Sequence, residues 1–256
     1  MFVLYDNPFS PFARKVRMAL DFKAIPYRSI DALALAEHAG LRAVNRRAEV
    51  PVLVDGDLAV RESADICAYL EDRFPAPALL PSSPASRAAA RRWQRVADTV
   101  LDAIIHDVSL WTWPTHHRSD TPPAGLLEAG QRDLDLILAE LDRALGASDF
   151  VCGDPSVADL ALFPHVSSLK VLGIALAPYA NVSGWSARMR TLPCVRSDLE
   201  YVKRSAIEKF APGASPYEAE KVVWRGDRIE WLLAHGFAAW FWAELAAGRA
   251  VVPRSV

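Results

Sequence analysis

Apolar residues near the N-terminus alternate between the spacing of strands and the spacing of helices. Residues 2–6 form a short apolar run rich in strand formers, and residues 11–24 place apolar side chains on one helical face. Residues 26–30 predict a second strand, and residues 32–44, rich in alanine and leucine, are weakly helical. This alternation predicts a parallel pair of strands joined by a crossover helix.

The pattern then changes to that of a hairpin. Residues 50–60 contain two apolar runs around Asp-Gly-Asp, which is a turn signal. The next segment, 62–70, has apolar residues at helical spacing, and we expect Ser63 to be its N-cap. Strand, helix, strand, helix, hairpin, helix is the order of a thioredoxin-like α/β domain, which we place at residues 1–78.

The strand signal stops beyond a linker that contains Pro75, Pro77, Pro81 and Pro84. Apolar residues then recur three and four positions apart, which is typical of helices. The expected helices lie at residues 86–113, 124–145, from Ser156 towards Gly173, and near 178–191 and 195–208. Asp159, three residues after Ser156, completes a capping box. The pattern predicts an all-α helical bundle at residues 86–210.

A third region, residues 211–256, forms a C-terminal extension. Residues 220–231 resemble a hairpin turning at Gly226-Asp227, and residues 237–245 resemble a helix rich in aromatic side chains. Exposed to water, these aromatic residues would form an apolar patch larger than soluble monomers tolerate. We therefore expect the extension to be packed, either on its own helical bundle, over a ligand pocket, or against a second subunit.

The composition is that of an ordinary globular protein and argues against several other classes of protein. The 256 residues are 52% hydrophobic and 23% charged, with a formal net charge of −2. No lysine/arginine run favours nucleic acid, and no apolar run reaches the roughly 18 residues that span a membrane. The opening residues lack a signal-peptide pattern, and the three cysteines are sparse and far apart. We expect a cytoplasmic protein.

Ser10 carries the most informative chemistry. Asn7-Pro8 marks a turn, after which Ser10 occupies the N-cap position of a helix with Pro11 as its first residue. The free N–H groups and the positive dipole end of the helix favour an anion beside the hydroxyl. A simple cap without a catalytic role is the alternative, and the two roles are compatible.

Five motifs in register, between residue 2 and about residue 208, resemble the glutathione S-transferase family. Asn7–Phe12 is similar to the Ser-Pro-Phe opening of the serine-type enzymes, and Val50-Pro51 to the Val-Pro that precedes the family's hairpin. Residues 62–70 match Glu-Ser-x-x-Ile-x-x-Tyr-Leu. The remaining two are the capping box of residues 156–159 and the late-helix signature from Asn181 to Trp185, with Arg188 and Pro193.

The resemblance implies specific roles in binding glutathione as co-substrate. Ser10 would donate a hydrogen bond to the sulfur and favour the thiolate. Ser63 would hold the γ-glutamyl carboxylate and Glu62 the ammonium group, while Val50 before a cis-Pro51 would pair with the cysteinyl amide. A serine in place of cysteine also removes the nucleophile for disulfide exchange, which argues against a glutaredoxin. Similar transferases are usually homodimers, so we expect one here.

Two positions depart from the family pattern. Glu49 lies where lysine or glutamine often meets the glycyl carboxylate, and it would repel that group unless Arg14, Arg46 or Arg47 compensates. Asn45-Arg46 also replaces the usual Asn-Pro. We include Glu49 and Arg14 in the expected glutathione site.

The resemblance places an acceptor pocket between Ser10 and the first long helices. Its expected lining residues are Phe12, His106, Trp111, Trp113 and His116. The tryptophans are equally explained as bundle core and the histidines as a solvated helix face. His116-His117 lacks a third ligand, so we expect no metal.

The functional prediction is that the chain conjugates glutathione to a hydrophobic electrophile, as in detoxification. Two alternatives remain open from the residues: a non-catalytic ligand- or partner-binding module, and a specialised dehalogenase, isomerase or ether-cleaving enzyme. Pro-Phe-Ser-Pro departs from the Ser-Ser run typical of the isomerases.

Overall fold

The structure, a computed structural model, describes residues 1–32, 37–113, 118–210, 222–223 and 225–252. Its N-terminal part is a four-stranded mixed sheet. The strands are β1 (Phe2–Asp6), β2 (Tyr27–Asp31), β3 (Val52–Asp55) and β4 (Leu58–Arg61), in the spatial order β2-β1-β3-β4. β1 is parallel to β2 and antiparallel to β3, which forms a hairpin with β4.

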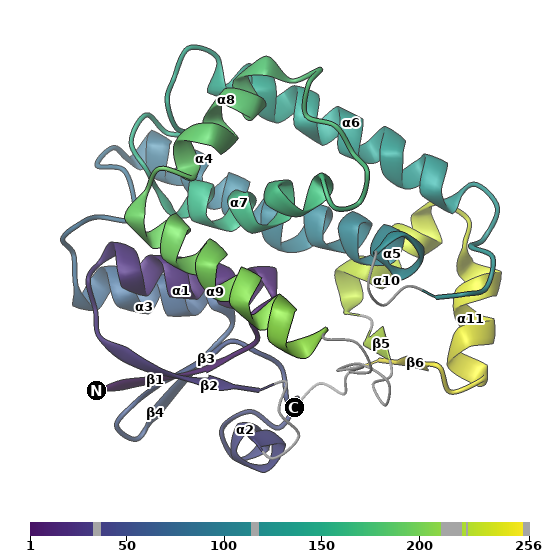
Figure 1. The fold of residues 1–256 in the computed structure, drawn as a ribbon, viewed down its shortest axis with the longest axis horizontal. Coiled ribbons are helices and arrows are strands. Elements are labelled where there is room, and N and C mark those ends of the chain that lie inside the picture. The colour runs from purple at the N-terminus through teal and green to yellow at the C-terminus, as the bar shows by residue number, and fades with distance from the viewer. Residues whose placement is uncertain (33–36, 114–117, 211–221, 224, 253–256) are drawn as a thin grey trace.

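Helices cover both faces of this sheet. α1 (Pro11–Phe22) and α3 (Ser63–Arg73) lie on the face towards the helical region, while α2 (His38–Val44) lies on the other face (Figure 1). Leu41 of α2 is buried in a small core with Val52 of the sheet. The predicted thioredoxin-like arrangement is confirmed.

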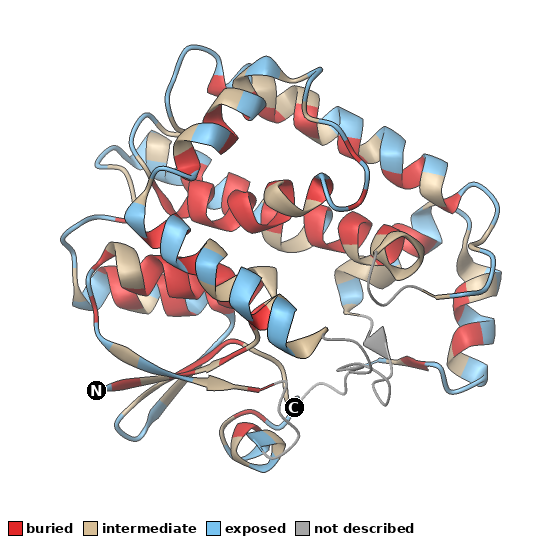
Figure 2. Cartoon of the chain, in the orientation of Figure 1, coloured by how far each residue is buried: buried red, intermediate tan, exposed pale blue. Residues whose placement is uncertain are grey.

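The second part of the chain is helical, as predicted. Its helices are α4 (Pro84–Val96), α5 (Asp102–Thr112), α6 (Leu126–Leu145), α7 (Val157–Leu169), α8 (Ala180–Met189) and α9 (Pro193–Lys209). A π-helical segment, η2 (Ala97–Leu101), joins α4 to α5, a feature that periodicity did not predict. Figure 2 shows that burial is greatest along α7, which also packs against α1 and α4.

A polar cluster fixes the start of α7. Asp159 is fully buried and accepts hydrogen bonds from the Ser156 N–H and hydroxyl, both at 2.9 Å. It also accepts from Trp185 Nε1 of α8 at 2.9 Å and from the Val151 N–H at 3.0 Å. The predicted capping box is confirmed, and it also ties α8 to the core.

The C-terminal extension differs from its predicted hairpin, and that prediction is wrong. Residues Gly226–Ala234 form a helix, α10, with Asp227 in its first turn, where the helix dipole favours an acid. The short strand β5 (Val222–Val223) pairs in parallel with the distant β6 (Ala250–Val251). The aromatic helix, predicted at 237–245, is present as α11 (Ala238–Ala246).

The extension is packed, as expected, against the helical bundle. Trp231 of α10 is 7% exposed and donates from Nε1 to Asp133 of α6 at 2.8 Å. Arg228 pairs with Asp102 of α5 at 2.9 Å, and Phe241 of α11 is 1% exposed. In Figure 1 the yellow helices α10 and α11 lie at the end of the bundle beside α5.

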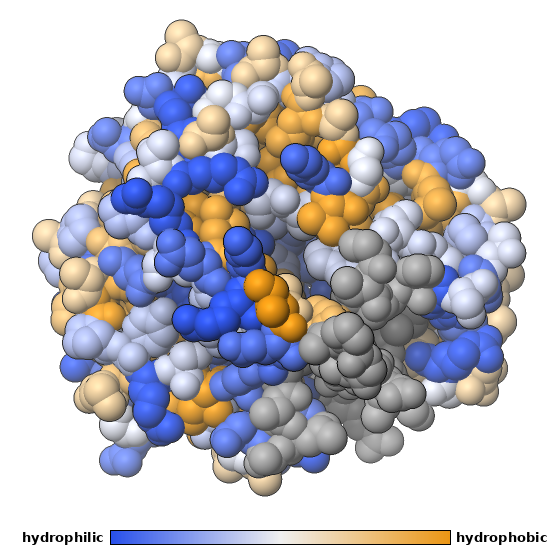
Figure 3. Space-filling model, in the orientation of Figure 1, coloured by the Kyte–Doolittle hydropathy of each residue, from blue (hydrophilic) through white to orange (hydrophobic). Residues whose placement is uncertain are grey.

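The surface in Figure 3 interleaves hydrophilic and hydrophobic residues. Within the part of the chain that the structure describes, no helix is both long and apolar enough to cross a bilayer. In the same residues, no group of three or more histidine, cysteine or acidic side chains is arranged to hold a metal ion.

We predict that His165, buried in α7, makes the protein less stable in mild acid. Burial lowers the pKa of His165 to about 4, and Lys15, Arg14 and Arg228 add to the effect although Asp102 opposes it. Because this pKa is below the unfolded value of about 6.5, the neutral ring stabilises the fold above pH 6.5. That stability is lost as the pH falls towards 4. Between pH 7.5 and 5 we expect a loss of about 2 kcal/mol from this group.

Urea unfolding at pH 7.5 and pH 5 tests this prediction. His165→Asn should be less stable than the wild type at pH 7.5 but should lose less on acidification. His38→Gln, which changes a histidine on α2 outside this core, is the control. An identical pH dependence in the wild type and His165→Asn would contradict the prediction.

Candidate active site

Ser10 caps α1 at the end of the loop that follows β1. Its backbone is extended, and its Oγ accepts a hydrogen bond from the Ala13 N–H at 3.4 Å. The loop is held by two bonds to Asn7, from the Ser10 N–H at 3.1 Å and from the Phe9 N–H at 2.9 Å. The capping prediction is confirmed. Because the hydroxyl only accepts in this bond, its proton is available for a ligand.

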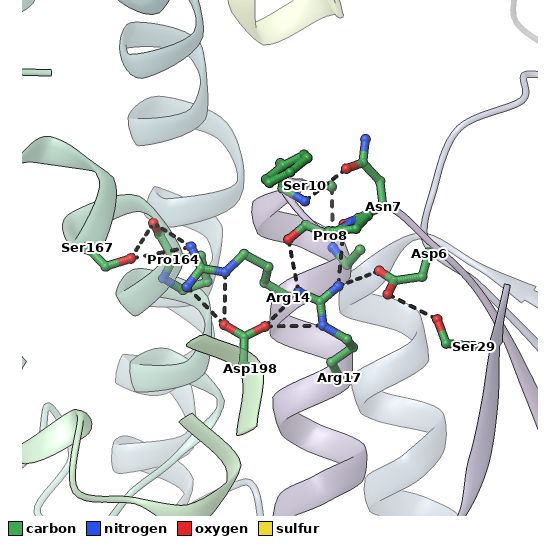
Figure 4. Close-up of polar contacts among 12 residues, drawn as sticks. Asp6, Asn7, Pro8, Ser10, Arg14, Arg17, Ser29, Pro164, Ser167 and Asp198 are labelled. Atoms are coloured by element: carbon green, nitrogen blue, oxygen red, sulfur yellow. Dashed lines mark hydrogen bonds and ion pairs between the residues drawn. The ribbon is translucent and has the colours of Figure 1, made fainter. Parts of the chain in front are cut away.

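Below Ser10, the polar face of α1 is joined to α9 by a buried charge cluster (Figure 4). Arg14 and Arg17 both bind Asp198, with Arg14 Nε at 2.9 Å and Arg17 Nη2 at 2.6 Å. Arg17 also pairs with Asp6 of β1 at 2.5 Å. Arg14 is 6% exposed and its guanidinium faces Asp198, so the expectation that it offsets Glu49 is wrong.

Arg47 is the residue that neutralises Glu49. Two guanidinium nitrogens of Arg47 reach the two carboxylate oxygens at 2.6 and 2.9 Å. Asn45 supports this turn, since its side-chain amide donates to the Glu49 carbonyl at 2.9 Å and its oxygen accepts from the Arg47 N–H at 3.2 Å. The two departures from the family pattern therefore form one local structure, in which the charge of Glu49 is paired.

The peptide bond between Val50 and Pro51 is cis, as the resemblance implies. Pro51 is buried immediately before β3, and Val50 is half-buried. The structure thus places Val50 at the turn that leads into the sheet, next to the Arg47–Glu49 pair in sequence.

Glu62 and Ser63 form the junction between β4 and α3. Ser63 is the first residue of α3 and is 4% exposed, while Glu62 is the N-cap, so the prediction that Ser63 is the cap is wrong. Glu62 has φ 58° and ψ 122°. Such backbone strain costs on the order of 1–3 kcal/mol in a residue other than glycine and is concentrated at functional sites. The sequence gives no signal of it.

A cavity of about 540 Å³ lies between α3 and α4 and contains both of these residues. Its described lining includes Phe12 of α1, Asp98 and Thr99 of η2, and Arg225 of the C-terminal extension. The other lining residues are Ala64, Asp65, Cys67, Ala68, Glu71, Leu79, Leu80, Arg91, Gln94, Arg95 and Val157. The structure therefore brings Phe12 into the same cavity as the expected γ-glutamyl residues.

Three further predicted acceptor residues, His106, Trp111 and Trp113, lie outside the lining of this cavity. Trp111 packs against Trp240 of α11, with ring centroids 5.5 Å apart, and Trp113 packs against the hydrophobic core. The His106 ring lies 2.9 Å from Asp107, and burial lowers the pKa of His106. None of these three lines the cavity described above, and His116 lies outside the described residues.

Sequence reasoning missed Asp98 and Arg225. Lys15 is fully buried and its Nζ lies 2.5 Å from Asp98 Oδ2, a pair that joins α1 to the π-helical segment. π-Helical turns frequently mark functional sites, but their sequences look like ordinary helix. Arg225 lies within residues 220–231, whose pattern indicated a hairpin, so nothing pointed to its place beside Phe12.

Comparison with known proteins agrees with this geometry. Residues 4–78 match the model of the glutathione S-transferase N-terminal domain, and residues 124–188 match that of the C-terminal domain. A four-stranded thioredoxin-like sheet, a cis-proline before its hairpin and a helical second domain define the same class. The chain therefore belongs to the glutathione S-transferase family, and its class of enzyme is that of the glutathione transferases.

The alignments with individual relatives extend over most of the chain. Glutathione S-transferase GstB of Escherichia coli is 28% identical over 77% of this chain and 96% of its own length. FtsZ-localized protein A of Caulobacter vibrioides is 26% identical over 75% of this chain and 88% of its own. The crystal structure of a glutathione S-transferase from Rhodospirillum rubrum superposes with a TM-score of 0.66, at 27% identity over 78% of this chain and 92% of that one.

Proposed function

We propose that this protein binds glutathione, stabilises its thiolate through the Ser10 hydroxyl, and conjugates it to a hydrophobic electrophile. The observation that carries the proposal is the position of Ser10 as N-cap of α1, where Oγ accepts a long 3.4 Å hydrogen bond from the Ala13 N–H. The hydroxyl proton can then point to a sulfur anion beside the helix N-terminus.

The required stabilisation is of a size that this site can supply. A free thiol with a pKa of about 8.5 is only a few per cent ionised at neutral pH. Lowering that pKa by about 2 units takes about 2.7 kcal/mol. A charge-assisted hydrogen bond together with a helix dipole contributes free energy of this order.

The rest of the tripeptide would extend along the sheet edge. In the proposal, Ser63 and the N–H groups at the start of α3 receive the γ-glutamyl carboxylate, and Glu62 receives the ammonium group. Val50 meets the cysteinyl amide. The Arg47–Glu49 pair supports the proposal because it removes a bare negative charge from the expected position of the glycyl carboxylate. The acceptor would enter beside Phe12.

A glutathione-affinity column combined with a conjugation assay using 1-chloro-2,4-dinitrobenzene tests this function. Retention on the column, elution by free glutathione and conjugation above the uncatalysed rate would support it. Failure to bind glutathione would contradict it and would favour a non-catalytic binding module, the alternative to which the Glu49 departure points. Binding without conjugation of this aromatic acceptor would favour a specialised glutathione-dependent enzyme.

We also propose that the protein is a homodimer. The hairpin of β3 and β4 together with α3 of one chain would meet α4 of the other. Leu58 at the start of β4 is 49% exposed, which supports an apolar contact at the hairpin.

We predict that Leu58→Glu shifts the protein from dimer to monomer, because it would place a charge in an apolar interface. Light scattering at micromolar concentration measures the change. Leu136→Glu, at a leucine of α6 that is 71% exposed, is the matched control and should leave the dimer intact. A wild-type monomer under these conditions would rule out the dimer.

A further inference from the structure

Arg225 brings the C-terminal extension to the cavity. It directly precedes α10, and its guanidinium carbon lies 4.7 Å from the centroid of the Phe12 ring. Arg225 and Phe12 line the cavity together with Ser63. Phe12 follows Ser10 by two positions in α1, so a residue more than 200 positions away in the sequence contacts the helix turn that Ser10 caps.

The position of Arg225 is fixed by its neighbours in α10. Three residues further on, Arg228 pairs with Asp102 of α5, with 2.9 Å between Nε and Oδ2. Trp231 is buried and donates to Asp133 of α6. These two anchors hold α10 on the bundle without involving the Arg225 side chain, so the guanidinium is preorganised at the cavity.

Among the described residues, the Arg225 guanidinium donates no hydrogen bond. Its guanidinium carbon lies over the Phe12 ring, and a contact of this kind uses none of the five N–H donors of an arginine. The nearest acid that pairs with it among the described residues is Asp227, at a long 3.8 Å. Asp98, which also lines the cavity, is already paired with Lys15. The Arg225 side chain is 27% exposed, so a ligand can reach it.

A second residue of the lining has a donor with no partner among the described residues. Gln94 of α4 is 8% exposed, and its Nε2 has no hydrogen-bond partner among the described residues. A buried amide without a partner is unfavourable, and a ligand oxygen would satisfy it. Glu71 in the same lining is paired with Lys23, which leaves Glu62 and Asp65 as the exposed acids at the rim.

We propose that the cavity receives a carboxylate, which Arg225 binds through its N–H edge, with the Gln94 amide as a further donor. The inference rests on the proposed function and adds to it a ligand class and a role for the C-terminal extension. Two sources share this chemistry: the α-carboxylate of glutathione, and a carboxylate on the second substrate. The acids at the rim suit the ammonium group of glutathione, and Arg225 would join Ser63 in holding its carboxylate in a cavity whose lining also contains Arg91 and Arg95.

Calorimetric titration with three ligands tests the inference without requiring turnover. The ligands are glutathione, the conjugate that glutathione forms with 4-chloro-3,5-dinitrobenzoate, and the same conjugate with only its benzoate carboxylate converted to a methyl ester. The variants are Arg225→Gln and Arg225→Lys, which differ in charge and share the loss of the planar fork. Arg190→Gln is the matched control, because Arg190 also lies over a phenylalanine ring, Phe163 at 5.5 Å, but does not line this cavity.

We expect Arg225→Gln to weaken carboxylate binding about tenfold, with Arg225→Lys intermediate and Arg190→Gln unchanged. If the second substrate supplies the carboxylate, only the acid conjugate loses affinity. If glutathione supplies it, all three ligands lose affinity equally. Unchanged binding of all three by Arg225→Gln would overturn the inference and leave the proposed function intact. Absence of binding by the wild type would overturn both.

Discussion

Ser10→Ala should lower the rate of conjugation by up to about 25-fold at pH 7 and about 75-fold near pH 6. Without the hydroxyl, the bound thiol loses a charge-assisted hydrogen bond and its pKa returns towards that of free glutathione. The rate of the wild type should level off near neutral pH, whereas that of the variant should keep rising into the alkaline range. Activity against pH, measured with saturating glutathione and a fixed acceptor, shows the difference.

Ser83→Ala is the matched control for Ser10→Ala. Ser83 caps α4 with Pro84 at the first helical position, so it has the same Ser-Pro arrangement away from the proposed sulfur position. Both variants should lose about 1 kcal/mol of stability with the cap, but only Ser10→Ala should lose activity. Ser10→Thr keeps a hydroxyl and should retain much of the rate. Full activity with an unchanged pH profile in Ser10→Ala would make Ser10 a cap and nothing more.

Asp159→Ala should destabilise the fold by about 3 to 5 kcal/mol. The Asp159 carboxylate accepts four hydrogen bonds in a fully buried position, from Val151, Ser156 and Trp185. Removing it leaves those donors without partners and opens a cavity at the start of α7. Because α7 packs against both α1 and α4, we expect unfolding to remain a single cooperative transition at a lower urea midpoint.

Urea unfolding followed by circular dichroism measures the change. Asp154→Ala, at an exposed acid five residues earlier, is the control and should be nearly neutral. Asp159→Asn keeps the shape but replaces one accepting oxygen with a donor, so it should fall between the control and Asp159→Ala. A cost below about 1 kcal/mol for Asp159→Ala, the net value of one ordinary hydrogen bond, would show that the cluster does not hold the core together.

Features encoded by adjacent residues were predictable from the sequence. The Ser10 cap depends on Pro11 and the first turn of α1, and the α7 capping box on two residues three positions apart. The order of the strands and helices follows from local periodicity in the same way. Each of these signals is contained in a few neighbouring residues, so it can be interpreted without knowing which distant residues come into contact in the folded chain.

Features that depend on distant partners were not predictable. Arg14 was expected in the glutathione site, but its partner Asp198 lies 184 positions away on α9. The contact of Trp111 with Trp240 of the extension, 129 positions away, is likewise absent from any local pattern. The predicted hairpin failed because the partner of β5 is β6 near the C-terminus, while Gly226-Asp227 begins a helix.

The pKa of the glutathione thiol in the complex tests the central claim most directly. It is measured by titrating the ultraviolet absorbance of the thiolate with the wild-type protein in excess over glutathione. The account predicts a thiol pKa about 2 units below that of free glutathione, which corresponds to about 2.7 kcal/mol, and most of this shift should be lost in Ser10→Ala. Bound glutathione with the same thiol pKa as free glutathione would contradict it.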